Sequence, residues 1–188
     1  MDRATALDLR VVASQIGRMP RGVTGVPRRC SFGFPQVVQV HPVVDGKPFP
    51  TLYWLTCPFL SRELDHLEAA GWIGRLESEV AHDSELLKEL LEAREDYVSR
   101  RLAELSTVER SRLDDVGMLA ALADRGIGGI AEKDRLKCLH LHVAHELSAS
   151  NPIGRRALGM LGARECLADE VFCSAPSKGA EQTQQINR

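Results

Sequence analysis

Three side chains of metal-binding type recur at helical spacing late in the chain. Cys138, His142 and His145 occupy positions i, i+4 and i+7 of a helix that we expect over residues 132–149. At about 100° per residue, they fall within one narrow stripe of that helix, whereas His140 lies off the stripe and is left out. Because neighbours at i and i+4 have Cβ atoms only about 5–6 Å apart, a thiolate and an imidazole in this stripe can bind one ion.

Two further cysteines can complete a tetrahedral site. Cys30 lies in a loop bounded by glycine and proline, and Cys57 precedes a proline at the end of a predicted strand. A rigid backbone at such positions can hold a thiolate toward an ion. The sequence therefore predicts that Cys30, Cys57, Cys138 and His142 converge in space. His145 is an alternative ligand or a hydrogen-bonding partner of one.

The donor atoms indicate which ion this site would bind. A cysteine-rich site with an imidazole suits zinc, which we prefer, although three thiolates and one histidine also suit an iron–sulfur cluster. Four protein ligands would make a structural site. Three ligands and a water would instead allow hydrolysis of a phosphate-bearing substrate.

A structural interpretation of the thiols stands beside the metal hypothesis. Free cysteines are often buried and behave as small apolar side chains, and the chain holds no C-x-x-C pair. Residues 142–146 (HVAHE) match neither the H-E-x-x-H nor the H-x-x-E-H order, so we do not predict a zinc protease. Cys166 and Cys173 lie near the C-terminal tail and are interpreted as structural.

Four arginines share a glycine-rich segment near the N-terminus. Residues 17–29 (GRMPRGVTGVPRR) hold Arg18, Arg21, Arg28 and Arg29 beside glycines that let the backbone approach a ligand closely. Guanidinium groups bind phosphate bidentately, so we predict an ordered loop that binds a phosphate-bearing small molecule or a nucleotide. No Walker or dinucleotide fingerprint is present. The alternative is a solvated loop whose arginines cover apolar surface or pair with acidic helices.

The elements that must position these side chains indicate an α+β fold, mostly helical. Two β-prone runs, residues 36–41 and 51–56, flank an Asp45-Gly46 turn and predict a small antiparallel hairpin. A first helix is expected between Asp2 and Gly17, and beyond residue 61 the apolar residues recur with helical period. We therefore expect several helices packed around the hairpin.

Composition narrows the class of protein. With 188 residues and 44% hydrophobic content, the chain is long enough for one core, so we expect a single globular domain over residues 1–173. Residues 174–188 hold almost no apolar side chains and predict a disordered tail. A net charge of −2 gives no overall attraction to nucleic acid or membrane, so neither is expected as a partner. Without a signal peptide or an apolar span, and with an odd number of cysteines, the predicted location is cytoplasmic.

Several short motifs give the chain a resemblance to a known family. They are Gly17-Arg-Met-Pro-Arg-Gly22, Arg29-Cys30, Pro48-Phe-Pro-Thr-Leu-Tyr-Trp-Leu-Thr-Cys-Pro58, Lys137-Cys-Leu-His-Leu-His-Val-Ala-His145 and Asn151-Pro-Ile-Gly154. With these motifs the chain resembles the uncharacterised bacterial family called domain of unknown function 501. The resemblance implies a bacterial cytosolic protein and carries no assigned activity, cofactor or mechanism.

Three classes of function remain open from the sequence. The first is the metal-binding protein described above, beside an anion-binding loop. The second is a cysteine-dependent enzyme acting on a phosphate-bearing substrate, in which Cys138 or Cys30 is a nucleophile activated by a histidine or by nearby arginines. The third is a non-catalytic adaptor module whose charged helices contact a partner protein and whose loop contacts a nucleotide or RNA.

Overall fold

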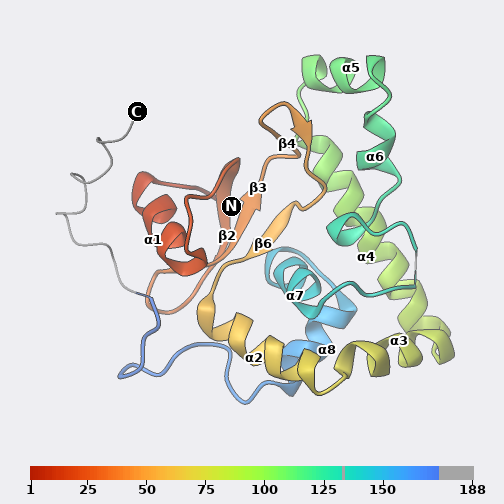
Figure 1. Ribbon diagram of the computed structural model, residues 1–188. Coiled ribbons are helices and arrows are strands. Elements are labelled where there is room, and N and C mark those ends of the chain that lie inside the picture. Colours follow the sequence, from red (N-terminus) through yellow and green to blue (C-terminus); the bar gives the residue numbers. More distant parts are fainter. Residues whose placement is uncertain (133, 174–188) are drawn as a thin grey trace.

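A computed structural model describes residues 1–132 and 134–173, so the predicted tail over 174–188 lies outside the described residues. The elements are β1 (Asp2–Arg3), α1 (Ala6–Ile16), β2 (Val23–Arg29), β3 (Pro35–Val40), β4 (Val43–Val44), β5 (Lys47–Pro48), β6 (Tyr53–Leu55), α2 (Pro58–Ala69), α3 (Trp72–His82), α4 (Ser84–Ala103), α5 (Thr107–Asp115), α6 (Leu119–Ala123), the 3-10 turn η1 (Ile127–Gly129), α7 (Leu139–Ser148) and α8 (Pro152–Met160). This confirms the predicted α+β, mostly helical fold (Figure 1).

The predicted hairpin is the centre of a larger sheet. Strands β3 and β6 pair antiparallel, with Val38 opposite Trp54, which confirms the pairing of the two β-prone runs. The full order is β1-β2-β3-β6, and every neighbouring pair in it is antiparallel. Strands β4 and β5 form a separate ribbon closed by Asp45 and Gly46, both with positive φ, as a tight hairpin turn requires.

The segment predicted to be an anion-binding loop is largely strand β2. Gly25 and Pro27 argue against a regular strand, but the β2–β3 pairing carries register shifts on both sides of Gly25 that accommodate them. At Gly25 a Cβ would stand about 3 Å from atoms of Met1 and Asp2, so the glycine lets β1 approach β2. The loop prediction was therefore wrong for residues 23–29, because glycine and proline mark bulges here.

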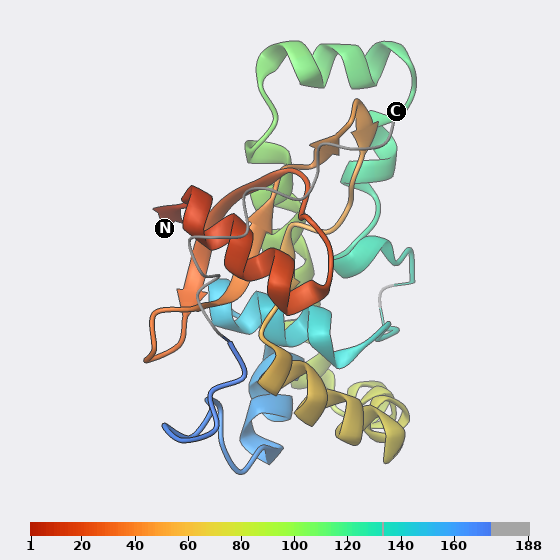
Figure 2. The ribbon, with the colours of Figure 1, turned by 60° about the vertical axis from the view of Figure 1, so that its left-hand side comes forward.

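Helices cover both faces of the sheet. Successive residues of β3 point to opposite sides: Val38 packs with Val12 of α1, whereas Val37 belongs to the main core. On that side β6 lies directly against α7. The sheet is thus enclosed between α1 and α7 (Figures 1 and 2).

Helix α1 begins and ends at residues of capping type. Thr5 is its N-cap and forms a reciprocal capping box with Asp8, so Asp2, which we expected to cap it, lies in β1 instead. Gly17 takes the left-handed conformation that ends the helix, as predicted. The end of α1 is therefore defined at Gly17, and Gln15, Ile16 and Arg18 on either side of it line the pocket described below.

Helix α7 is the buried centre of the fold. Leu139, Val143 and Ala144 are fully buried in the main cluster, which also includes residues of β6 and α2. Its neighbour α8 packs so closely that a Cβ at Gly154 would overlap the backbone carbonyl of His142. In the described part of the chain, no helix has the length and apolar character needed to cross a membrane.

Candidate functional site

A pocket of about 520 Å³ opens between the end of α1, strand β6, the start of α2 and the chain entering α7. Part of its lining is apolar and includes residues of β6. Its polar wall is formed by the chain entering α7 and the first turn of that helix, and carries a thiol, an imidazole and an ammonium group. Its lining residues are Gln15, Ile16, Arg18, Phe49, Thr51, Trp54, Leu55, Thr56, Pro58, Ser61, Lys137, Cys138, His140 and Leu141.

Three side chains of metal-binding type converge at the polar wall. Glu68 comes from the last turn of α2, Cys138 immediately precedes α7, and His140 lies in the first turn of α7. One ligand atom from each lies within 4.8 Å of the others, and all three residues are half-buried. The described residues contain one such group of three or more histidine, cysteine or carboxylate side chains, and it is this one.

Backbone hydrogen bonds fix this arrangement. Leu139 is fully buried and anchors the first turn of α7, so Cys138 and His140 on either side of it stay near the surface. The Leu139 amide donates to Oε1 of Glu68 at 2.6 Å, which uses the carboxylate to satisfy one of the free N–H groups at the helix start. The Leu136 amide likewise donates to Glu77 of α3 at 2.8 Å.

His140 has polar neighbours at both ring nitrogens. Nδ1 lies 3.0 Å from Oε1 of Glu68, whereas Nε2 lies 3.3 Å from the Ser61 carbonyl oxygen and 3.5 Å from Oδ1 of Asp65. The hydrogen bond with Cys138, followed by the charge of Glu68, raises the pKa of His140 to about 9 against the opposing effect of burial. Without a bound ion, the imidazole is therefore positively charged at neutral pH.

Two cationic side chains border the same pocket. The guanidinium of Arg18 lies 5.0 Å above the ring of Trp54, and this contact holds an exposed side chain over the pocket wall. On the opposite side, Nζ of Lys137 donates to the Gly128 carbonyl at 3.4 Å. The pocket thus combines an apolar wall, two positive charges and the group of Glu68, Cys138 and His140.

The predicted stripe of Cys138, His142 and His145 is not formed. Helix α7 begins at Leu139, and Cys138 is extended, with φ −161° and ψ 154°, so helical spacing does not relate it to the two histidines. Both histidines point into the core and share Asn151, whose Oδ1 lies 3.3 Å from His142 and whose Nδ2 lies 3.2 Å from His145. Burial lowers the pKa of each to about 4, so both are neutral at physiological pH.

Cys30 and Cys57 do not join Cys138 in the described structure. Cys57 is buried at the N-cap of α2, where burial raises the pKa of its thiol to about 11. Cys30 follows β2 in the turn toward β3, where its amide donates to the Phe34 carbonyl. The predicted convergence of these two cysteines with Cys138 and His142 is not found, since no three of those ligand atoms gather within 4.8 Å.

The four arginines of the predicted anion site have different surroundings. Arg29 forms a two-pronged ion pair with Asp8, with contacts of 2.6 and 2.9 Å, and this pairing lowers the pKa of Asp8 to about 2. Arg21 pairs with Asp45 at 2.7 Å on the surface, and Arg28 is exposed on β2. Arg18 therefore remains as the arginine at the pocket, and anion binding by the other three stays a prediction.

Sequence reasoning missed Glu68 and His140. Had the segment before α7 been interpreted as extended, Cys138 and His140 at i and i+2 would have been expected on one side. The placement of the helix start excluded that possibility. Glu68 lies about seventy positions earlier in the chain, and nothing local to it indicates that it meets them.

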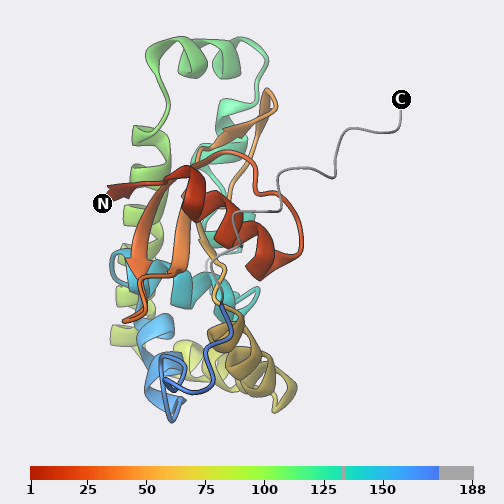
Figure 3. The same ribbon diagram turned by 90° about the vertical axis from the view of Figure 1, so that its left-hand side faces the viewer.

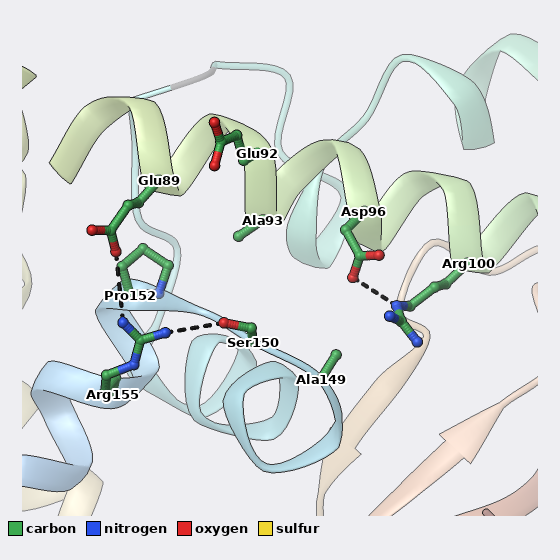
Figure 4. Close-up of a pocket in the computed structure, with 9 residues that line it drawn as sticks. All are labelled: Glu89, Glu92, Ala93, Asp96, Arg100, Ala149, Ser150, Pro152 and Arg155. Carbon is green, nitrogen blue, oxygen red and sulfur yellow. Dashed lines mark hydrogen bonds and ion pairs between the residues drawn. The ribbon is translucent and has the colours of Figure 1, made fainter. Parts of the chain in front are cut away.

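A second hollow, of about 490 Å³, lies between α4 and the α7–α8 junction and is lined by many charged side chains (Figure 4). Here the charges pair with one another. Arg100 contacts Asp96 at 2.6 Å, and Arg155 contacts Glu89 at 3.6 Å and the Ser150 hydroxyl at 3.0 Å. Since these ion pairs already satisfy the cations of this hollow, it offers less for a ligand than the pocket beside Cys138.

Comparison with known proteins gives one match. A family model described as "Protein of unknown function (DUF501)" matches residues 26–159, which is most of the chain, and this confirms the resemblance that the motifs predict. No curated protein and no solved structure matches the chain. The matched range includes Glu68, Cys138 and His140 and excludes the motif at residues 17–22.

Proposed function

We propose that this protein, which belongs to the DUF501 family of unknown function, binds a zinc ion through Glu68, Cys138 and His140. The ion would stand at the polar wall of the pocket, and Arg18 would hold an anionic group of a ligand there. The carrying observation is that one oxygen, one sulfur and one nitrogen from distant parts of the chain lie within 4.8 Å of one another. Zinc accepts this mixture of donors.

The contacts of His140 suit a ligand of a shared ion. Here Glu68 lies at Nδ1, while Nε2 faces the Ser61 carbonyl and Asp65. A metal-bound histidine commonly has a carbonyl or carboxylate at its second nitrogen, because this contact orients the ring and strengthens it as a ligand.

Three protein ligands leave one position of a tetrahedral zinc ion free. Bound water at such a position is acidic enough to supply hydroxide near neutral pH. The free position would open toward a pocket that carries Arg18 and Lys137. A phosphate-bearing small molecule is therefore the substrate class that we propose, with hydrolysis as the reaction.

Zinc titration of metal-free protein tests the proposal. We expect Cys138→Ser and Glu68→Gln to abolish tight binding at this site, since each removes a ligand, while glutamine keeps an acceptor for the Leu139 amide. His66→Gln is the matched control, because His66 is an exposed histidine of the same helix as Glu68. Because zinc needs a neutral imidazole, binding should also release protons near pH 7, measurable in buffers of different ionisation enthalpy.

The decisive comparison is between the ligand variants and the control. If Cys138→Ser and Glu68→Gln bind as many zinc ions, and as tightly, as His66→Gln does, the three residues are not the ligands and the proposal fails. Circular dichroism on the same samples shows whether each variant is folded.

A second candidate function rests on one observation, the charged imidazole beside Cys138. The pKa of His140 is raised to about 9, and a cysteine beside a cationic imidazole at a helix N-terminus is a common arrangement of nucleophilic cysteines. In metal-free protein, Cys138 should then react with iodoacetamide faster than the other cysteines near neutral pH. Protection of Cys138 by one equivalent of zinc would support the metal site, whereas reactivity unaffected by zinc would support the nucleophile.

A further inference from the structure

The remaining four cysteines lie on three segments that meet at one end of the sheet. After α8 the chain has no helix or strand through residue 173, and it returns toward the β2–β3 turn and the start of α2 (Figures 1 and 3). Cys166 and Cys173 lie on this returning segment. Cys30 lies in the β2–β3 turn, and Cys57 at the start of α2.

One hydrogen bond joins the β2–β3 turn, which carries Cys30, to the returning segment, which carries Cys166. The amide of Ser31, the residue after Cys30, donates to a carboxylate oxygen of Glu165, the residue before Cys166, at 3.1 Å. Cys30 and Cys166 are therefore the sequence neighbours of two residues that are hydrogen-bonded to each other.

The other contacts bring in Cys57 and Cys173. The amide of Cys57 donates to the Gln36 carbonyl at 3.3 Å, and the Gln36 side chain donates to the Arg164 carbonyl at 3.0 Å. Nε2 of Gln15 lies 3.2 Å from Sγ of Cys173 and donates to the Pro35 carbonyl at 2.8 Å.

An aromatic contact closes the same region. The rings of Phe59 and Phe172 lie 6.0 Å apart, and these residues are respectively two positions after Cys57 and one before Cys173. The guanidinium of Arg62 lies 4.7 Å from the Phe172 ring, which adds a cation–π contact to this docking. The returning segment is thus attached to the rest of the fold before Cys166, through Arg164 and Glu165, and before Cys173, through Phe172.

A purely structural role accounts poorly for these thiols. Free cysteine in a core is a small buried side chain, and Cys57 fits that description. Cys30, Cys166 and Cys173 are only half-buried, and all are free. Three partly exposed thiols around a buried one resemble a ligand set more than a core.

We propose that Cys30, Cys57, Cys166 and Cys173 bind a second zinc ion as four thiolates, which fastens residues 161–173 to the end of the sheet. Four cysteine ligands are typical of structural zinc sites, in which no position is left for water. The four sulfurs are more widely spaced than the ligand atoms at Cys138, since no three of them gather within 4.8 Å. Binding therefore draws the returning segment inward.

Metal content and cobalt substitution test this proposal on the full chain. We expect anaerobically purified wild type to hold two zinc ions, and Cys166→Ser/Cys173→Ser to hold one. Cys138→Ser is the matched control that loses the other ion. With cobalt in place of zinc, the intense thiolate-to-metal absorption should fall in the double variant to the weak band of the single Cys138 thiolate, and should stay close to the wild-type intensity in Cys138→Ser.

Proteolysis gives a readout that is independent of stoichiometry. Arg164 is exposed in the returning segment, and trypsin should cut there faster after zinc is removed from wild type, with protection restored by added zinc. The proposal is overturned if the double variant keeps two zinc ions and the wild-type cobalt spectrum. It is also overturned if purified wild type carries a Cys166–Cys173 disulfide, or iron with acid-labile sulfide, at these residues. Loss of the Cys138 site alone leaves it standing.

Discussion

The two sides of helix α7 place the same residue type in opposite environments. His140 faces the pocket, where Cys138 and Glu68 raise its pKa to about 9. His142 and His145 face the core, where burial lowers their pKa to about 4. Spacing along a helix identifies which residues share a face. The neighbours of that face decide whether a histidine is charged, neutral or available to an ion.

On the core side, Nδ1 of each histidine has a neutral partner, whereas neither buried Nε2 has a hydrogen-bond partner. Asn151 contacts Nδ1 of both His142 and His145, and the rings of Tyr53 and Tyr97 pack around His145 with centroids 5.9 and 5.0 Å away. The pocket side instead offers the carboxylates of Glu68 and Asp65. The two sides should therefore differ in pH dependence, in the cost of truncation and in ligand binding.

The largest effect should be the pH dependence of stability in the metal-free protein. Between pH 6.5 and about 4 the unfolded chain binds more protons than the folded one, because folding lowers the pKa of His142 and His145. Their contribution is complete above pH 6.5 and is lost as pH falls toward 4. His140 acts oppositely: its contribution is complete below pH 6.5 and is lost as pH rises through about 9.

Urea denaturation at a series of pH values measures both slopes. His140→Gln should flatten the alkaline slope and leave the acid slope unchanged. A free energy of unfolding that stays constant as pH falls from 6.5 toward 4 would contradict the assignment of two neutral, buried histidines.

The next largest difference should be in the stability lost when a histidine on each side of α7 is truncated to alanine. His145→Ala leaves a cavity among packed aromatic rings and should cost about 3 kcal/mol of unfolding free energy. His140→Ala removes a half-buried side chain and should cost about 1 kcal/mol or less. Chemical denaturation of both variants at one pH makes the comparison, and equal losses would show that the two sides are packed alike.

A smaller effect should follow from the outer neighbour of His140. Asp65→Asn removes the charge 3.5 Å from Nε2 and should weaken zinc binding about 10-fold, as loss of a partner behind a ligand typically does. Asp96→Asn is the matched control, since Asp96 lies 3.7 Å from Nε2 of His145 on the core side. Competition with a zinc chelator gives both affinities, and a loss in the control as large as in Asp65→Asn would sink the assignment of sides.

The smallest effect should come from the pocket rim. Arg18→Gln should weaken binding of inorganic phosphate to the zinc-loaded protein by about 5-fold or less, because Arg18 is exposed and such charges contribute up to about 1 kcal/mol. Arg75→Gln should have no effect, since Arg75 is an exposed arginine 4.8 Å above the Trp72 ring of α3 and does not line the pocket. Calorimetry at low ionic strength makes the measurement, and identical affinities for the two variants would remove Arg18 from the site.

Much of the fold is predictable from local patterns. The β-prone run of β3, the Asp45-Gly46 turn and the helix end at Gly17 each depend on a few neighbouring residues, and each is found as predicted. Strand β2 was missed because its bulges allow glycine and proline inside it, and bulges depend on the partner strand. Local patterns therefore predict which helices and strands exist better than they predict where each begins and ends.

The candidate site is less predictable for the same reason. Cys138 was identified from its residue type, but its alignment with His142 and His145 required it to lie inside the helix. The helix was predicted to begin at residue 132, seven residues before α7 does. Glu68 meets Cys138 only through the packing of α2 against α7, which no short window of sequence contains. Cys166 and Cys173 were interpreted as structural because the return of their segment to the sheet is likewise a tertiary contact.

The close packing of Gly154 against the His142 carbonyl has a mechanical consequence. With no side chain between them, α7 and α8 meet backbone to backbone, so neither can slide along the other without a collision. A displacement at Cys138, such as one caused by ligand entry, is therefore not absorbed at this junction. We expect such a displacement to move α8 together with α7, and with α8 the segment that follows it and carries Cys166 and Cys173.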